Sequence, residues 1–357
     1  MKIALLTLPV DNNYGGHLQR YALMKALQQM GLDVVHLNMR FPWEKKSKKK
    51  KVKRIVKRLL KYVQSKITQK KFVPEPSNFS CYLNADYITD YFYYRYVKHT
   101  KRIYDKKDLT KYLGFDMFIV GSDQVWRYKY TNHMYGINTY FFDYLPKQLP
   151  RMAYGASFGT KENEFDEEVV KRLGNYYKLF SNVSVREKES IQNIYNYEWE
   201  GPRPTCVLDP TLLLPQEDYV EIVKRGKTKP SEGNLFCYVL DKTEQNKSII
   251  FEISRDRCLS PFEITLGGGC SVEQWLRSFI DAEFVITDSY HGLLFSLLFN
   301  KPFYLCKNEE RGGMRFDNIL NLLGITGVEN KYDWEKINKI LSQEKEHSFT
   351  YLNKCIL

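Results

Sequence analysis

A histidine in the stretch FVITDSYHGLLFSLLFNKPF, residues 284–303, is the clearest candidate for chemistry in this chain. The stretch opens with apolar strand residues and continues with the turn and helix N-cap types Thr287, Asp288 and Ser289. His291 follows at once, and an apolar segment that we expect to be a buried helix comes next. An imidazole at the mouth of a helix can act as a general acid or base, or it can merely cap the helix.

Two other polar turns follow predicted strands. Residues 115–120 are apolar and lead into Gly121 and Asp123, and residues 183–185 lead directly into Arg186. In open α/β folds, ligands bind at the carboxyl ends of parallel strands, where exposed backbone N–H groups also favour an anion. Asp123 is therefore a candidate acid or base, with helix capping as its structural alternative. A glycine at position 121 would let the backbone approach a ligand closely.

Composition indicates a globular protein from a reducing compartment. The chain has 357 residues, enough for two domains, and 43% of them are hydrophobic. No apolar run is long enough for a transmembrane helix, and the first ten residues resemble a buried strand more than a signal peptide. The cysteines are scattered without a C-x-x-C pair, at positions 81, 206, 237, 258, 270, 306 and 355. We therefore expect a cytoplasmic protein without a metal site.

The chain begins with a strand–helix–strand unit. Residues 2–8 and 34–37 have the character of strands, and residues 18–30 have helical periodicity. The loop between the first strand and the helix, PVDNNYGG, places two glycines at the helix N-terminus. This is only weakly typical of a nucleotide-binding turn, because the spacing G-x-G-x-x-G is absent.

Alternating strands and helices continue along the chain and predict an α/β fold with two domains. A strand and an Asp-Pro turn within residues 207–213 mark the end of the first domain. The polar segment 215–233 is interpreted as the crossing between domains, and a new strand begins at Leu235. We therefore predict an N-terminal domain of residues 1–213 and a C-terminal domain of residues 214–357, with sheet-edge loops of both lining a cleft.

One segment carries the whole net charge of +12. Residues 45–71 contain fourteen Lys or Arg and no acid, so the remainder has a net charge of 12 − 14 = −2. Apolar residues recur within this segment at helical spacing, at positions 52, 55, 56, 59, 60, 63 and 67. The pattern predicts a basic amphipathic helix inserted in the first domain, which suits an anionic membrane surface. Two alternatives are an insertion whose apolar stripe packs on its own domain, and a nucleic-acid contact, which no aromatic or motif pattern supports.

Several motifs resemble those of the polysaccharide pyruvyl transferase family. They are NYGGHLQRYAL at residues 13–23, GSDQVW at 121–126, SVREKES at 184–190, VLDPTLL at 207–213 and DSYHGLLFSLLFNKPF at 288–303. They occur in the family's order and span most of the chain. The resemblance implies two Rossmann-like domains facing each other across a cleft, as in the two-domain glycosyltransferases of the GT-B type.

The resemblance also implies an activity: transfer of a pyruvyl group from phosphoenolpyruvate to two hydroxyls of a sugar, giving a cyclic ketal and phosphate. In the family's pattern Arg186 binds the donor, and His291 is catalytic, as acid to the donor or as base to the acceptor. A donor-binding cation of the next loop matches Arg315 best, with Arg311 and Lys307 as neighbours. Many characterised members carry an arginine two residues before the histidine, where this chain has Ser289. That departure removes one donor-binding cation from the motif, and Ser289 takes its place as a candidate donor-binding residue.

The acceptor side is expected at the opening motif. We assign acceptor binding to Asn13, Gly15, Gly16 and Gln19, with Asp123 as a second catalytic group. The acceptor would be a sugar of a surface polysaccharide or its lipid-linked precursor, and the basic segment would hold the enzyme at the inner membrane face. No cofactor besides the co-substrate phosphoenolpyruvate is expected, and no nucleic acid. A two-domain cleft would equally suit a glycosyltransferase with a nucleotide-sugar donor, or a non-catalytic glycan-binding scaffold.

Overall fold

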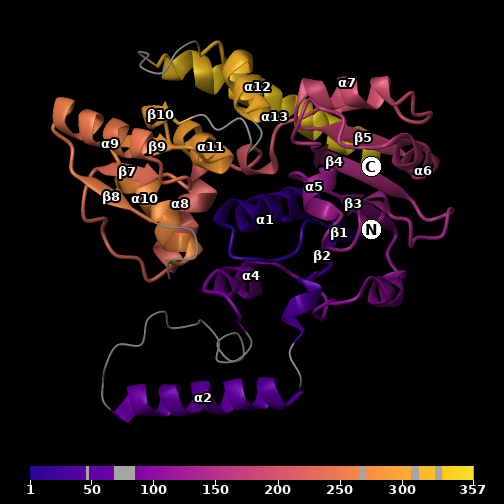
Figure 1. Ribbon diagram of the computed structural model, residues 1–357, viewed down its shortest axis with the longest axis horizontal. Helices are drawn as coiled ribbons and strands as arrows, with labels where there is room; N and C mark the ends of the chain where they lie inside the picture. The colour runs from indigo at the N-terminus through magenta and orange to yellow at the C-terminus, as the bar shows by residue number, and fades with distance from the viewer. Residues whose placement is uncertain (46–47, 68–84, 265–269, 307–312, 326–331, 357) are drawn as a thin grey trace.

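The computed structural model describes residues 1–45, 48–67, 85–264, 270–306, 313–325 and 332–356. In these residues it forms two parallel sheets, each with helices packed on its faces (Figure 1). Side chains from the two sheets' loops line a common cavity. The predicted α/β class, with two Rossmann-like domains facing each other across a cleft, is therefore confirmed. The exact boundary between residues 213 and 214 stays a prediction.

The first sheet has the strand order β2-β1-β3-β4-β5-β6, and every pairing in it is parallel. Its strands are β1 (Lys2–Leu6), β2 (Asp33–His36), β3 (Met117–Val120), β4 (Arg151–Ala156), β5 (Asn182–Val185) and β6 (Thr205–Cys206). Most of their residues are buried, as expected for parallel strands covered on both faces. Because all six strands run the same way, the loops that follow them meet at one edge of the sheet.

Helices and short 3-10 turns connect these strands. They are α1 (Tyr14–Gln29), η1 (Pro42–Glu44), α2 (Lys48–Ile67), α4 (Asp90–Tyr96), η2 (Lys106–Tyr112), α5 (Tyr128–Thr131), η3 (Ile137–Phe141), α6 (Glu167–Tyr177), α7 (Lys188–Asn196) and η4 (Pro210–Leu212). Helix α1 is buried on most of its surface and lies between the two domains (Figure 1). Although α1 belongs to the first domain, it also contacts the second: the ring of Tyr14 stacks on Trp275 at 5.7 Å between ring centroids.

The second sheet is smaller, with the parallel order β10-β9-β7-β8. Its strands are β7 (Leu235–Tyr238), β8 (Pro261–Glu263), β9 (Phe284–Thr287) and β10 (Phe303–Leu305), and its helices are α8 (Gln216–Arg225), α9 (Glu244–Asp256), α10 (Val272–Asp281), α11 (Tyr290–Leu298) and α12 (Met314–Leu323). Helix α11 is buried over most of its length, as the apolar sequence predicts. The predicted turn at residues 287–289 thus stands at the carboxyl end of a parallel strand.

Two elements differ from the sequence interpretation. The segment predicted as a polar crossing contains α8, whose Tyr219, Ile222 and Val223 are buried although their neighbours are charged. Ile222 and Val223 follow Tyr219 at spacings of three and four residues, and this spacing places all three side chains on one buried face of the helix despite the charged residues between them. The last helix, α13 (Trp334–Ile356), returns to the first domain (Figure 1), where the Ser348 hydroxyl accepts a hydrogen bond from the Leu208 amide at 3.0 Å.

Helix α2 stands apart from both domains (Figure 1). Its apolar stripe is largely in contact with solvent: the residues exposed along it are Val52, Val56, Leu60, Val63 and Ile67. Leu60 is 65% exposed and Ile67 is 76% exposed. The predicted helix is therefore present, and these five side chains are not buried against the described residues of either domain, as the packing alternative required. No described helix is long and apolar enough to cross a membrane.

Candidate active site

A cavity of about 340 Å³ lies between the two domains. Residues from the loops of both sheets line it: Leu8, Pro9, Asp11, Asn13, Phe41, Asp123, Gln124, Tyr130, Met134, Tyr238, Leu240, Asp288, Ser289, Tyr290, His291 and Arg315. The structure thus brings together the predicted residues Asn13, Asp123, Ser289, His291 and Arg315. The same loops close strands β1, β3, β7 and β9. The cavity therefore lies at the carboxyl ends of parallel strands, where loop side chains and backbone amides can contact a ligand.

Asp123 projects into this cavity from the turn after β3. Its carboxylate Oδ1 accepts a hydrogen bond from Arg186 Nη2 at 3.1 Å and lies 3.7 Å from Arg315 Nη1. Although burial alone would raise the pKa of Asp123, Arg186, His291 and Arg315 more than offset it, so the pKa falls to about 2. Asp123 is therefore a carboxylate at any physiological pH. It can accept a hydrogen bond from a sugar hydroxyl or orient a cation.

Arg186 is enclosed by carboxylates. Besides Asp123, its Nη1 donates to Asp209 at 2.5 Å and its Nε to Glu187 at 3.3 Å. Its side chain is only 1% exposed, and it does not line the cavity described above. Each edge of the guanidinium already has an anionic partner, so toward the interdomain cavity Arg186 acts through Asp123. Removing a cation so placed would leave three buried carboxylates.

Tyr290 joins the two arginines. The guanidinium carbon of Arg186 lies 4.7 Å from the centroid of its ring, and that of Arg315 lies 4.9 Å from it. Both distances suit a cation–π contact, and burial strengthens such contacts. Tyr290 thereby holds the two guanidiniums at a fixed separation beside Asp123. Burial raises the pKa of its phenol, so the ring stays neutral.

His291 lies at the N-terminus of α11 and is 6% exposed. Its Nε2 makes no hydrogen bond to a described residue, and it lies 3.9 Å from the Asp209 carboxylate. Burial lowers the pKa of His291, while Asp209 and Asp123 raise it in part. The imidazole is therefore neutral at neutral pH and has a nitrogen available for proton transfer. Capping of α11 is performed by Ser289, whose hydroxyl accepts from the Gly292 amide at 3.4 Å, so the structure removes the alternative that His291 is the cap.

Helix α1 packs directly against this histidine. A Cβ atom at Gly15 would lie 2.2 Å from His291 Nδ1 and 2.3 Å from its Cγ, a separation that real atoms do not reach. Gly15 is therefore the residue that lets the two domains meet at the imidazole. At Gly121, a Cβ would lie 2.0 Å from the Tyr154 carbonyl oxygen. The close approach predicted for Gly121 is made to strand β4 and not to a ligand, because the turn folds back over its own sheet.

The remaining predicted residues have structural partners. Asn13 caps α1 by accepting a hydrogen bond from the Gly16 amide at 3.1 Å, and it also lines the cavity. Gln19 is buried and accepts from the Ser122 amide at 3.2 Å, so it holds the turn that carries Asp123. Gly15, Gly16 and Gln19 are not among the lining residues. Arg311 lies outside the described residues.

Sequence reasoning assigned no role to Tyr290, Asp209 or Glu187. Asp209 and Glu187 occur in quoted motifs and directly follow predicted strands, which was the signal that could have found them. Their function depends on neighbouring strands: β5 delivers Arg186 and Glu187, and β6 delivers Asp209 beside them. A pairing of strands is not visible in the sequence.

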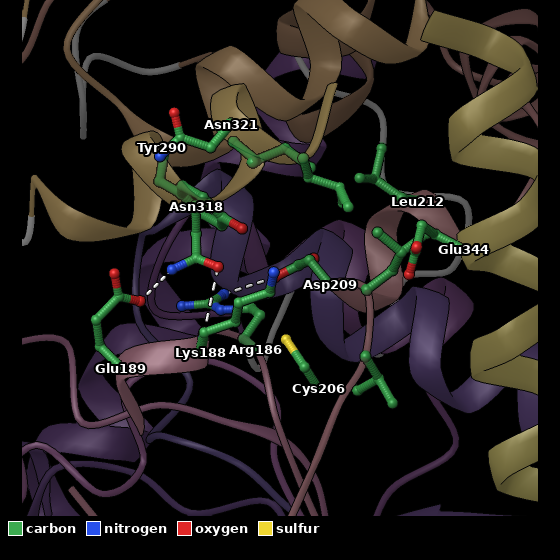
Figure 2. A pocket seen from close by; sticks show the side chains of 14 residues that line it. Arg186, Lys188, Glu189, Cys206, Asp209, Leu212, Tyr290, Asn318, Asn321 and Glu344 are labelled. Atoms are coloured by element: carbon green, nitrogen blue, oxygen red, sulfur yellow. Dashed lines mark hydrogen bonds and ion pairs between the residues drawn. The ribbon is translucent and has the colours of Figure 1, made fainter. Parts of the chain in front are cut away.

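Arg186 and Asp209 of this ion-pair cluster line a second pocket, of about 320 Å³ (Figure 2). It is lined by Arg186, Lys188, Glu189, Cys206, Val207, Leu208, Asp209, Leu212, Tyr290, Asn318, Ile319, Asn321, Leu322 and Glu344. Asn318 of α12 bridges the domains here, because its amide donates to Glu189 and its carbonyl accepts from the Lys188 amide at 3.4 Å. The cluster thus forms a wall between two pockets.

The comparison with protein families matches the model named "Polysaccharide pyruvyl transferase" to residues 13–310. This chain belongs to the polysaccharide pyruvyl transferase family. Membership confirms the resemblance seen in the motifs and makes the protein a transferase of polysaccharide biosynthesis. No curated protein matches the sequence significantly.

Solved structures of similar fold include nucleotide-sugar enzymes. One is the Methanocaldococcus jannaschii UDP-GlcNAc 2-epimerase in complex with UDP-GlcNAc and UDP, which is 11% identical with a TM-score of 0.49 over 99% of this chain and 100% of that chain. Another is the Neisseria meningitidis UDP-GlcNAc 2-epimerase bound to UDP-GlcNAc, which is 10% identical with a TM-score of 0.46 over 97% of this chain and 100% of that chain.

Proposed function

We propose that this enzyme transfers the pyruvyl group of phosphoenolpyruvate to two hydroxyls of a sugar in a surface polysaccharide or its lipid-linked precursor. The observation that carries the proposal is the convergence of His291, Asp123 and Arg315 on one interdomain cavity. In the reaction, the methylene carbon of the donor gains a proton and becomes a methyl group. Both sugar oxygens bond to the central carbon, and the C–O bond to phosphate breaks. One hydroxyl proton replaces the proton taken up by carbon, and the other leaves with the phosphate.

His291 supplies a proton-transfer group and Asp123 a fixed negative charge, and this reaction needs both. The neutral imidazole of His291 can take a proton from a sugar hydroxyl and later deliver one to the donor. Asp123 stays ionised, because the two arginines hold its pKa near 2. It is therefore suited to orient a hydroxyl and to stabilise the positive charge that develops at the central carbon after protonation.

The anionic groups of the donor need cations. Of the predicted arginines, Arg315 lines the cavity, while Arg186 lies behind Asp123. We therefore assign the donor's carboxylate or phosphate to Arg315, whose planar guanidinium can bind either in a bidentate manner. Arg186 fixes Asp123 and contributes its charge from behind. Arg311 precedes Arg315 in sequence and lies outside the described residues; either arginine is a candidate source of the cation that Ser289 does not supply.

Release of inorganic phosphate tests the donor. The protein is incubated with phosphoenolpyruvate and a mixture of soluble bacterial-type glycans, and phosphate is measured against a no-acceptor control. Binding is measured in parallel as thermal stabilisation by phosphoenolpyruvate and by nucleotide sugars. Stabilisation by phosphoenolpyruvate that is weakened in Arg315→Met supports the proposal. Stabilisation by a nucleotide sugar alone would replace it with the glycosyltransferase alternative.

For a lipid-linked acceptor, α2 is the proposed membrane contact at the cytoplasmic face. Ten of the twenty residues of α2 are Lys or Arg and none is acidic, and its exposed stripe offers apolar side chains beside these cations. An exposed helix of this composition suits anionic headgroups and the acyl boundary together. Each basic residue near such a surface contributes about 1 kcal/mol before screening by salt.

Sedimentation with vesicles tests the membrane contact. The protein should pellet with vesicles that contain phosphatidylglycerol at low salt, pellet less at high salt, and remain in solution with neutral vesicles. Deletion of residues 45–71 should abolish pelleting. Leu60→Glu should weaken it, whereas Phe251→Glu should not, and the two side chains are matched in exposure at 65% and 66%. An intact protein that stays in solution with anionic vesicles at low salt would refute the membrane contact and leave the pyruvyl transfer proposal standing.

A further inference from the structure

An aromatic pair links the cavity to the basic helix. The rings of Phe41 and Trp43 stack at 4.7 Å between centroids with an interplanar angle of 18°. Phe41 lines the cavity, whereas Trp43 is 68% exposed. A single exposed aromatic residue would need no explanation. This one shares its stack with a wall of the proposed active site and directly precedes the most basic segment of the chain.

The backbone beneath this pair is firmly held. Arg40 forms a buried ion pair with Asp90 at 2.7 Å, and the Tyr135 hydroxyl donates to the Arg40 carbonyl. On the other side of Trp43, the Tyr87 hydroxyl donates to the Glu44 carboxylate. Trp43 is thus presented to solvent from a short segment that is anchored at both ends. An indole in this position keeps its apolar area exposed although the surrounding fold is fixed.

Chain length ties Trp43 to α2. Five residue steps separate Trp43 from Lys48, the first residue of the helix, and fully extended chain covers at most about 18 Å over five steps. If α2 lies in the plane of the headgroups, Trp43 is held within this distance of it. Headgroup level is also where tryptophan is favoured in membrane proteins, because its ring is apolar and its N–H remains hydrated.

We infer that Trp43 inserts into the membrane interface and that the side of the cavity lined by Phe41 therefore faces the bilayer surface. The inference rests on the proposed membrane contact of α2 and deepens it, because it fixes which face of the enzyme meets the lipid. The sugar of a lipid-linked acceptor would then enter past Phe41 while its lipid remains in the bilayer. A soluble oligosaccharide would need no such orientation.

Quenching of tryptophan fluorescence by brominated lipids tests this geometry directly. Of the five tryptophans, Trp126 and Trp275 are fully buried, and Trp43 is the exposed one. Intact protein is mixed with phosphatidylcholine and phosphatidylglycerol vesicles, with and without bromine on the acyl chains, and binding is measured by sedimentation in the same samples. We expect bromine-dependent quenching in the wild type and in the control Trp334→Phe, and loss of that quenching in Trp43→Phe.

Every outcome decides the inference. Vesicle binding without bromine-dependent quenching, or quenching that persists in Trp43→Phe, would overturn the assignment of Trp43 and leave the membrane contact of α2 intact. Failure of the wild type to sediment would overturn both. Neither result bears on phosphate release with a soluble acceptor, so the proposed reaction is judged separately.

Discussion

Substitution of Gly15 by alanine gives the sharpest test of how the two domains build the site. Gly15 lies in the first turn of α1, and helix propensity alone predicts that alanine stabilises the helix by about 1 kcal/mol. Packing predicts the opposite effect on function. The added methyl group would stand 2.2 Å from His291 Nδ1 and 2.8 Å from its Cβ. The imidazole and helix α1 therefore cannot both keep their present positions.

The size of the displacement follows from these contacts. Ordinary carbon contacts begin at about 3.5 Å, so the ring of His291 or the whole of α1 must move by more than an ångström. A displacement of this size in a catalytic group costs on the order of 10²-fold in rate. We therefore expect Gly15→Ala to lower turnover about 100-fold while its melting temperature stays near that of the wild type.

Gly16→Ala is the matched control. Gly16 occupies the next position in the same helix, but a Cβ there would meet only Asn13, at 3.6 Å, which is an ordinary contact. Phosphate release and thermal unfolding are measured for both variants. If Gly15→Ala retains turnover within about twofold of Gly16→Ala, the contact between α1 and His291 does not position the histidine, and the reasoning fails.

Four further predictions concern the charged cluster and its histidine. His291→Ala should lower turnover on the order of 10²-fold with the fold intact, as judged by circular dichroism. Because burial holds the pKa of His291 below its ordinary value of 6.5, and because a base acts in its neutral form, kcat/KM should decline only as pH falls below about 6.5. Asp209→Asn removes a carboxylate that raises the pKa of His291, so this acid limb should move to lower pH, and an unmoved limb would show that Asp209 does not act on the histidine. Arg186→Met should cost about 3–5 kcal/mol in the free energy of unfolding, since it leaves Asp123, Asp209 and Glu187 buried without their cation, and urea titration showing a loss below 1 kcal/mol would contradict this account.

Local sequence pattern determined much of this protein. Apolar runs followed by polar turns located β3, β5 and β9 and placed Asp123, Arg186 and His291 at their carboxyl ends. This worked because a parallel strand buried on both faces must be apolar and its loop must be polar. The spacing of apolar residues between the lysines likewise predicted α2. Family membership could be expected because its motifs are short and continuous in sequence.

Tertiary structure decided what these residues touch. Arg186 looked available for a donor, but three carboxylates from separate loops occupy its guanidinium, because β5 and β6 pair and the turn after β3 faces them. Phe41 lines the cavity together with residues of the second domain, and Gly15 packs against His291. Both contacts join residues that are far apart in the chain. Such contacts arise from strand order and domain packing, and these depend on the free energy of the whole core, whereas the residue types that form a strand, cap a helix or line a turn depend on their immediate neighbours.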